Sequence, residues 1–186
     1  MLDAKLQLLL EQGAVNAAHD LIGWHLYILE EDGSHTGGVI TETEAYTQED
    51  AASHSYRGRT ARTEVMFGSA GKLYVYFTYG MHWCVNIVTG HEGHGEAVLL
   101  RSIVPDAGLD HIRQRRANRP DSELTNGPAK ICQALDITGV DQGTTLNNGR
   151  IILLPPLSTC QQPTIKATER IGIRHDTYRL WRFVVA

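Results

Sequence analysis

The sequence predicts a single α+β domain over residues 1–186, built on a mostly antiparallel sheet. Many strand-like runs follow one another through short polar turns instead of through helices, which is typical of antiparallel connections. The chain has 186 residues, of which 42% are apolar and 20% charged, an ordinary composition for one globular core. No apolar run is long enough to span a membrane.

The first elements are expected to be two short helices and a hairpin. Asp3 is a suitable N-cap for a helix over residues 4–11, because its carboxylate can accept from the free backbone N–H groups of the first turn. A second helix is expected over residues 15–22. Residues 25–46 then form a hairpin that turns at residues 32–33, an Asp-Gly pair.

An irregular segment and an aromatic hairpin come next. Residues 47–70 are rich in Arg, Ser, Thr and Gly, and a loop of this length inside a compact domain is usually functional. In LYVYFTYGMHW (73–83), alternation places tyrosines on both faces of a strand that turns at Tyr79-Gly80, and a second strand returns over residues 82–88. The tyrosines either fill the core or line a pocket, and the stretch alone leaves both open.

The second half of the chain adds strands and two helices. A turn at 91–96 leads into the strand AVLLRSIVP, residues 107–118 form a basic helix ended by Pro120, and a helix begins at Pro128, where proline is favoured. Further strands are expected at RIILLPP (150–156), RIGI (170–173) and LWRFVV (180–185).

Charge is distributed unevenly along the chain. Residues 1–50 hold one Lys and ten acids, a balance of −9, whereas residues 51–186 hold sixteen basic residues and eleven acids, a balance of +5. Arginines cluster at Arg57, Arg59 and Arg62 and again at Arg113, Arg115, Arg116 and Arg119. Each cluster is either a solvated face or a phosphate-contacting surface, since Arg suits bidentate phosphate contacts.

Several residue groups could carry chemistry. Glu42 and Glu44 share one face of a strand and could do acid/base work, although such pairs are also common on solvated faces. HEGHGE (91–96) is not HExxH, so we expect no metal there. The four lysines give a weak case for an amine nucleophile. The three cysteines stand far apart without a CxxC pair, which favours a reducing compartment, the cytoplasm; no secretion signal is expected.

A basic surface, a hairpin tip, aromatic faces and an acid together suggest base flipping. An enzyme that acts on a base in duplex DNA must extrude it and fill the gap, and this costs a few kcal/mol. Stacking on aromatic side chains returns about 1–3 kcal/mol per base. The tip of the aromatic hairpin could be the wedge and Glu44 the acid/base group.

A series of ordered blocks supports this interpretation. They are TETEAY, DAASHS, GRTART followed by MFG, GKLYVYFTYGMHWCVNIV, AVLLRSIVP, NGPAKICQAL, RIGI and WRF. In this order they resemble the alkyladenine (3-methyladenine) DNA glycosylase family of the mammalian type, also found in bacteria, from about residue 20 to the end. The resemblance implies a curved antiparallel sheet with surrounding helices and a protruding DNA-intercalating hairpin, similar to the C-terminal domain of formyltransferases.

The resemblance also implies catalytic and pocket roles. Glu44 matches the general base, which activates a water for attack at C1′ of the flipped nucleotide, and Arg101 matches the arginine that helps to position that water. The implied base-pocket residues are Tyr46 and His54 on one side of the base, Tyr76 on the other, and Asn86, which discriminates against the exocyclic amino group of guanine.

The implied partner is damaged double-stranded DNA, which the protein would bind from the minor groove. In a bacterium this places the protein at the nucleoid. Tyr79, with Met81 beside it, matches the intercalating wedge, while His82 stands where the mammalian pattern has a tyrosine. The phosphate-binding candidates are Arg57, Arg59 and Arg62. The family uses water, so the reaction is expected to be monofunctional, without cofactor or metal, and a monomer is the simplest expectation.

Three other functions remain open. One is a DNA-binding module without chemistry, against which the presence of both Glu44 and Arg101 counts. Another is a glycosylase/lyase that uses Lys72 or Lys130, which borohydride trapping would detect. The third is a hydrolase or transferase for a small molecule, which salt-sensitive binding to duplex DNA would argue against.

Overall fold

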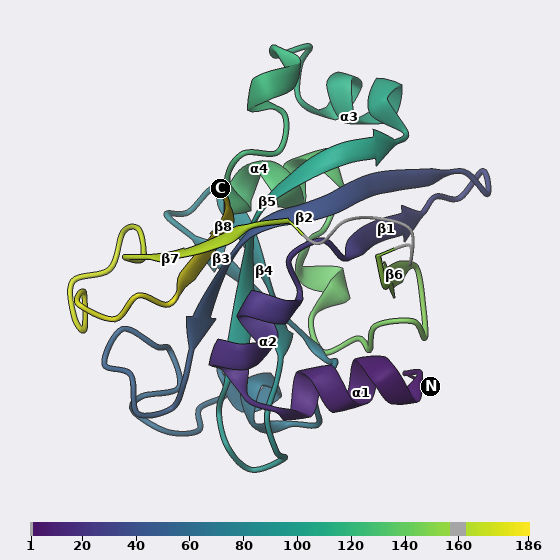
Figure 1. Ribbon diagram of the computed structural model, residues 1–186. Coiled ribbons are helices and arrows are strands. Elements are labelled where there is room, and N and C mark those ends of the chain that lie inside the picture. Colours follow the sequence, from purple (N-terminus) through teal and green to yellow (C-terminus); the bar gives the residue numbers. More distant parts are fainter. Residues whose placement is uncertain (1, 157–162) are drawn as a thin grey trace.

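The computed structural model describes residues 2–156 and 163–186, and Figure 1 shows how their elements are arranged. The helices are α1 (Ala4–Glu11), α2 (Ala14–Asp20), α3 (Leu109–Arg115) and α4 (Pro128–Ala134), with 3₁₀ turns η1 (Glu64–Phe67), η2 (Asp121–Glu123) and η3 (Gly139–Asp141). The strands are β1 (His25–Leu29), β2 (His35–Tyr46), β3 (Leu73–Thr78), β4 (His82–Val88), β5 (Ala97–Ala107), β6 (Ile151–Leu154), β7 (Ile165–Thr168) and β8 (Arg182–Val185). The α+β class is therefore confirmed.

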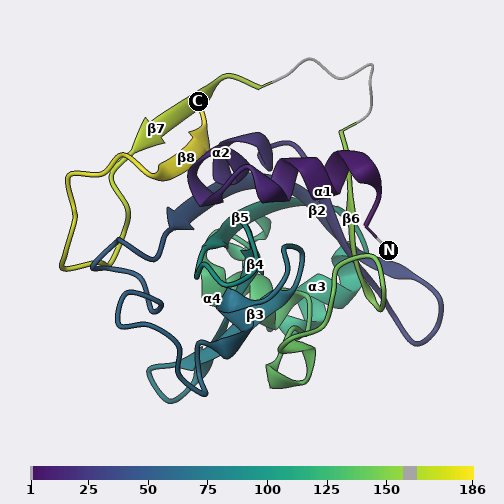
Figure 2. The same cartoon turned by 90° about the horizontal axis from the view of Figure 1, so that it is seen from below.

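The sheet is organised around the long strand β2. Its strand order is β3-β4-β5-β2-β1-β6, and the pairings are antiparallel. One edge of β2 pairs with β5, while the other edge pairs first with β1 and then with β8, which also pairs with β7. The sheet curls into a half-barrel, and Figure 2 shows this curl from below.

Helices pack against the sheet and complete its main hydrophobic core, beside which a smaller cluster forms around Met66, Phe67 and Tyr74. Asp3 accepts hydrogen bonds from the backbone N–H groups of Lys5 and Leu6 and so caps α1 as expected. Leu6 and Leu10 of this helix are completely buried, and burial of a leucine contributes about 2 kcal/mol. α2 packs on β2 and β5, whereas α4 packs on β4 and β5. None of the helices in the described ranges has both the length and the apolar content of a membrane span.

Most of the expected elements are confirmed, and one is wrong. Both N-terminal helices, the hairpin over residues 25–46, the aromatic hairpin and the helix starting at Pro128 are present. RIGI (170–173) is not a strand, and the strand of this region, β7, lies earlier in the chain. Gly172 has φ +77°, a left-handed conformation that interrupts a strand, and the N–H of Ile171 donates to the Glu44 side chain instead of to a neighbouring strand.

Candidate active site

Two β-bulges shape the sheet where β2 and β5 meet. The register of this pair shifts three times in all, and the two shifts on either side of Glu42 leave Thr41 as an extra residue on β2 and Arg101 as an extra residue on β5. A bulge re-aims a side chain and is common beside active sites. Here it places Arg101 over Glu42 and Glu44, which lie two residues apart on one face: Nε of Arg101 is 3.1 Å from Glu42 Oε1, and Nη1 is 3.2 Å from Glu44 Oε2.

The carboxylate of Glu44 is completely buried, and both its oxygens accept hydrogen bonds. Besides the Arg101 contact, Oε2 accepts from the Tyr46 hydroxyl at 2.8 Å, and Oε1 accepts from the backbone N–H of Ile171 at 2.7 Å. Burial and the neighbouring Glu44 carboxylate raise the pKa of Tyr46, so this hydroxyl keeps its proton and donates. These donors offset the cost of burying the carboxylate and hold it in one orientation.

The three groups that donate to Glu44 belong to residues lining a cavity of about 460 Å³. This volume suits a small aromatic ligand. The structure brings together six of the residues that the sequence assigned to the site, because the cavity is lined by Tyr46, His54, Tyr76, Tyr79, Asn86 and Arg101. Glu44 lies beneath them, out of contact with solvent.

Three aromatic side chains form one wall of the cavity. The His54 ring meets the Tyr76 ring edge to face at 4.7 Å between centroids, and Nδ1 of His54 lies 3.0 Å from the Tyr74 hydroxyl. His54 keeps an exposed edge, but desolvation against these rings and, secondarily, the charge of Arg62 lower its pKa to about 4. His54 is therefore neutral at pH 7. Asn86 donates to the carbonyl oxygen of Tyr74 at 3.0 Å, which fixes its amide in the same wall.

The tip of the β3–β4 hairpin forms one rim of the cavity. Tyr79 and Met81 are 85% and 69% exposed, and Tyr79 also lines the cavity. Both central residues of the turn, Tyr79 and Gly80, have positive φ angles of 51° and 68°. This is the pattern of a type I′ turn, which joins two strands tightly. Two large apolar side chains therefore stand in solvent beside the pocket.

The two arginine clusters differ in their surroundings. Arg57, Arg59 and Arg62 are exposed on the segment that also carries His54; Arg59 pairs with Glu64, and the guanidinium of Arg62 lies 5.4 Å from the centre of the Tyr76 ring. The second cluster is largely engaged within the protein. Its internal contacts are Arg113 to Asp110 and Asp121, Arg115 to Glu30, and Arg116 to the carbonyl oxygen of Leu124.

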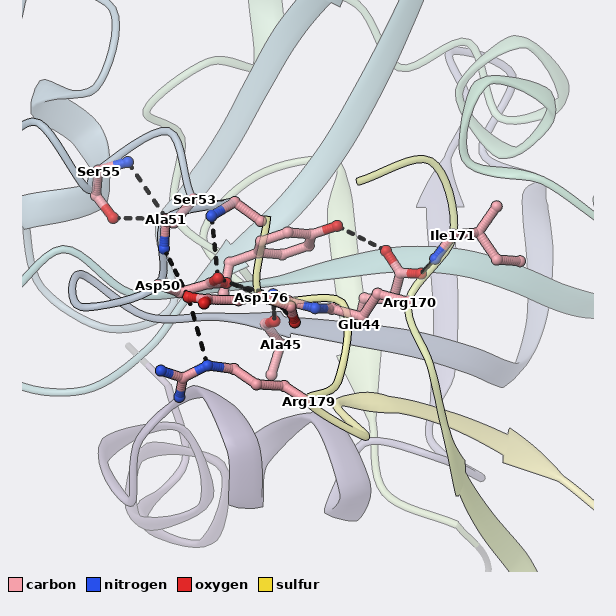
Figure 3. A network of polar contacts seen from close by, with 12 residues as sticks. Glu44, Ala45, Asp50, Ala51, Ser53, Ser55, Arg170, Ile171, Asp176 and Arg179 are labelled. Atoms are coloured by element: carbon pink, nitrogen blue, oxygen red, sulfur yellow. Dashed lines mark hydrogen bonds and ion pairs between the residues drawn. The ribbon is translucent and has the colours of Figure 1, made fainter. Parts of the chain in front are cut away.

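A polar network behind the cavity, which Figure 3 shows, was not predicted from the sequence. Its centre is the buried ion pair of Arg170 and Asp50, and it extends through Asp176 to Arg179. Asp50 begins the DAASHS block and Arg170 begins the RIGI block, so the resemblance to the family could have pointed to both residues. Arg174 and His175, which also line the cavity, had no such signal.

No group of three His, Cys, Asp or Glu side chains in residues 2–156 and 163–186 is arranged to hold a metal ion. In the HEGHGE turn, Nε2 of His94 instead lies 3.2 Å from Glu96 and 3.4 Å from Glu49. Glu96 in turn accepts from the backbone N–H of Ala14 at the start of α2. These contacts give the turn a structural role.

Comparison with known proteins assigns the chain to a family. Residues 9–186 match the model of the methylpurine-DNA glycosylase family. The chain belongs to this family. The match includes all of the site described above. As a member, the protein is a DNA glycosylase, a hydrolase that acts on N-glycosyl bonds in damaged DNA.

Curated relatives support the same assignment over nearly the whole chain. A protein of Methanoculleus marisnigri is 47% identical over 165 residues, which cover 88% of this chain and 85% of the relative. A protein of Carboxydothermus hydrogenoformans is 45% identical over 166 residues, 89% of this chain and 86% of the relative. A protein of Rhizobium etli is 43% identical over 175 residues, 93% and 81% respectively. Each bears the name "Putative 3-methyladenine DNA glycosylase".

Proposed function

We propose that this protein is a monofunctional DNA glycosylase that flips an alkylated or deaminated purine out of duplex DNA and leaves an abasic site. The observation that carries the proposal is the carboxylate of Glu44, held by three donors beneath an aromatic cavity beside an exposed hairpin tip. The names of the relatives support 3-methyladenine as one substrate.

The reaction requires a water, a base and a leaving purine. The water attacks C1′ as the bond between C1′ and the purine nitrogen breaks; Glu44 accepts a proton from the water, and Arg101 orients it. Because Glu44 is shielded from solvent in this structure, the side chains above it must shift to admit the water when the nucleotide binds. General-base help of this kind contributes roughly 10²–10⁴-fold. A purine alkylated at a ring nitrogen carries a positive charge and leaves as a neutral base, whereas a neutral lesion also needs a proton on the leaving group.

The flipped base is proposed to stack with Tyr46 and His54 on one side and Tyr76 on the other, with Asn86 testing for the exocyclic amino group of guanine. A base between two rings needs about 7 Å between them, twice a van der Waals separation. The His54 and Tyr76 rings are 4.7 Å apart at their centroids. The His54 ring must therefore move away from Tyr76 when a base enters.

The surroundings of the cavity support water as the nucleophile. Lys5, Lys72, Lys130 and Lys166 all lie in the described ranges, and none of them lines the cavity. Lys130 instead donates to Asn126 at 2.7 Å. A Schiff-base lyase would need an amine at C1′.

Tyr79 and Met81 are proposed to fill the gap in the minor groove, with Arg57, Arg59 and Arg62 on nearby phosphates.

The test is single-turnover excision from a duplex carrying one hypoxanthine or ethenoadenine. We expect the wild-type protein to form abasic sites and Glu44→Gln to lose about 100-fold or more in rate while still binding the lesion. Glu30→Gln is the matched control, since Glu30 is also a mostly buried carboxylate paired with an arginine, Arg115, but lies outside the cavity lining and touches neither Glu44 nor Arg101; we expect a much smaller loss.

Two results would separate the alternatives. If the wild-type protein leaves both neutral lesions intact, methylated genomic DNA distinguishes a specialist for cationic 3-methyladenine from a protein that only binds. If the Glu44→Gln variant excises the lesion as fast as the wild-type protein does, Glu44 is not the general base.

A further inference from the structure

A buried ion pair lies behind the ring of Tyr46 and outside the cavity lining. The side chains of Arg170 and Asp50 are completely shielded from solvent and meet through two contacts, Nη1 to Oδ2 and Nη2 to Oδ1, the latter at 3.0 Å. Figure 3 shows this pair at the centre of the network. Burying two charges costs desolvation energy, so such a pair contributes little to stability on balance. Its position next to the site indicates another use.

Arg170 contacts the end of β2 at two points, the backbone of Ala45 and the ring of Tyr46. Nη1 donates to the carbonyl oxygen of Ala45 at 2.9 Å, and this residue stands between Glu44 and Tyr46 in β2. The guanidinium carbon also lies 4.7 Å from the centre of the Tyr46 ring. Arg170 therefore fixes the backbone and the ring that direct the Tyr46 hydroxyl to Glu44.

Arg170 also determines the position of a second donor to Glu44 through the chain itself. The next residue is Ile171, whose backbone N–H donates to Glu44 Oε1 at 2.7 Å. This segment has no strand pairing of its own between β7 and β8. The buried Arg170 side chain consequently anchors the backbone that carries the donor.

Asp50 connects Arg170 to the segment that bears His54. Its Oδ1 accepts from the N–H of Ala52 at 3.0 Å, and its carbonyl oxygen accepts from the N–H of Ser53 at 2.8 Å. One ion pair thus joins the end of β2, the turn before His54 and the segment over Glu44. Two of the three donors to the Glu44 carboxylate therefore depend on this ion pair.

We infer that Arg170, through its ion pair with Asp50, is a positioning residue for the general base Glu44; this inference rests on the proposed function. Of the three donors that hold the carboxylate, Arg170 places two, the Tyr46 hydroxyl and the Ile171 N–H. A displacement of about 1 Å in a catalytic group can cost about 100-fold in rate.

Two variants test the inference without leaving a charge buried alone. Arg170→Lys keeps the charge but loses the planar fork that contacts Asp50 and Ala45 together. The double variant Asp50→Asn with Arg170→Gln removes both charges, which avoids the large penalty of an unpaired buried ion. Arg150→Gln is the control, because Arg150 makes a similar two-contact pair with Asp141 outside the cavity lining.

The measurements are the excision rate at saturating protein, the Kd for a lesion duplex and the thermal midpoint. We expect the excision rate to fall about 10- to 100-fold in both test variants, because the carboxylate of Glu44 is misplaced. The Kd should change less than about 3-fold, since the side-chain oxygen at position 50 can still accept from the N–H of Ala52 and hold the segment that bears His54. Arg150→Gln should keep the wild-type rate even if its midpoint falls.

Two outcomes would overturn the inference. One is a wild-type rate in Arg170→Lys and in the double variant; the other is a loss of rate matched by an equal loss of affinity, as a merely structural role would produce. Failure of the proposed function is recognised separately, since it would appear as an inactive wild-type protein or an active Glu44→Gln variant.

Discussion

At the scale of single residues, His54 shows how its neighbours set a charge state. Desolvation by the surrounding rings is the larger cause of its low pKa, and the charge of Arg62 is the smaller one. In the unfolded chain this imidazole returns to a pKa of about 6.5. The unfolded state then binds more protons between about pH 4 and pH 6.5, so His54 destabilises the protein as pH falls through this window.

The titration of His54 can be measured by NMR. We expect its ring to titrate near pH 4 in the wild-type protein and at a higher pH in Arg62→Gln, but still below 6.5, because desolvation remains. Arg57→Gln removes a charge from the same segment and should leave the midpoint unchanged. A wild-type midpoint near 6.5 would contradict this account, and a His54→Asn spectrum identifies the signal.

The sequence predicts the identity of such residues better than their surroundings. Alternation along a strand was enough to place Glu42 and Glu44 on one face. Alternation could not show that Glu44 is completely buried, because the segment that packs over it, at Ile171, is 127 residues away in the sequence. The bulge that turns Arg101 over both carboxylates was also invisible, since a register shift depends on two strands at once.

At the scale of elements, the aromatic hairpin carries strain at its tip. Tyr79 adopts a left-handed conformation, which costs an L-residue other than Gly, Asn or Asp roughly 1 kcal/mol. Asn-Gly is the preferred pair for a type I′ turn. A tyrosine here therefore indicates a functional use for the exposed ring, at some cost in stability.

Replacing Tyr79 should separate stability from function. We expect Tyr79→Asn to raise the free energy of unfolding by up to about 1 kcal/mol, because Asn tolerates this conformation, while excision from duplex DNA falls about 10- to 100-fold with the loss of the wedge. Urea denaturation and single-turnover excision measure the two effects. Tyr79→Phe keeps the ring and the strain, and both values should stay close to wild type; a fully active Tyr79→Asn would refute the wedge.

Elements with a strong local pattern were predictable, and the RIGI segment was not. Apolar residues at alternate positions indicated a strand at residues 170–173. In the structure the segment follows the demands of the site instead, with the Arg170 side chain in the buried pair and the N–H of Ile171 on Glu44. Such long-range contacts override local preference.

At the scale of the whole molecule, the charge relevant to DNA is smaller than the sequence suggests. The net charge is −4, and the balance of +5 after residue 50 includes the arginines of α3 and the residues after it. Arg113 and Arg115 of this group are paired with acids of the same protein. The face around the cavity therefore depends on Arg57 and Arg62, with Arg174 at the cavity lining, because Arg59 is itself paired with Glu64.

This distribution predicts a shallow salt dependence of DNA binding. Each neutralised phosphate contributes about −0.9 to the slope of log K against log salt, so about three contacts give a slope near −3. Arg57→Gln should bring the slope closer to zero by about one, because Arg57 is exposed beside the pocket. Arg113→Gln should leave the slope unchanged, since its guanidinium already contacts Asp110 and Asp121. Fluorescence anisotropy with a lesion duplex at several salt concentrations gives both values. If Arg113→Gln reduces the slope as much as Arg57→Gln, the DNA runs over α3 and away from the hairpin side of the cavity.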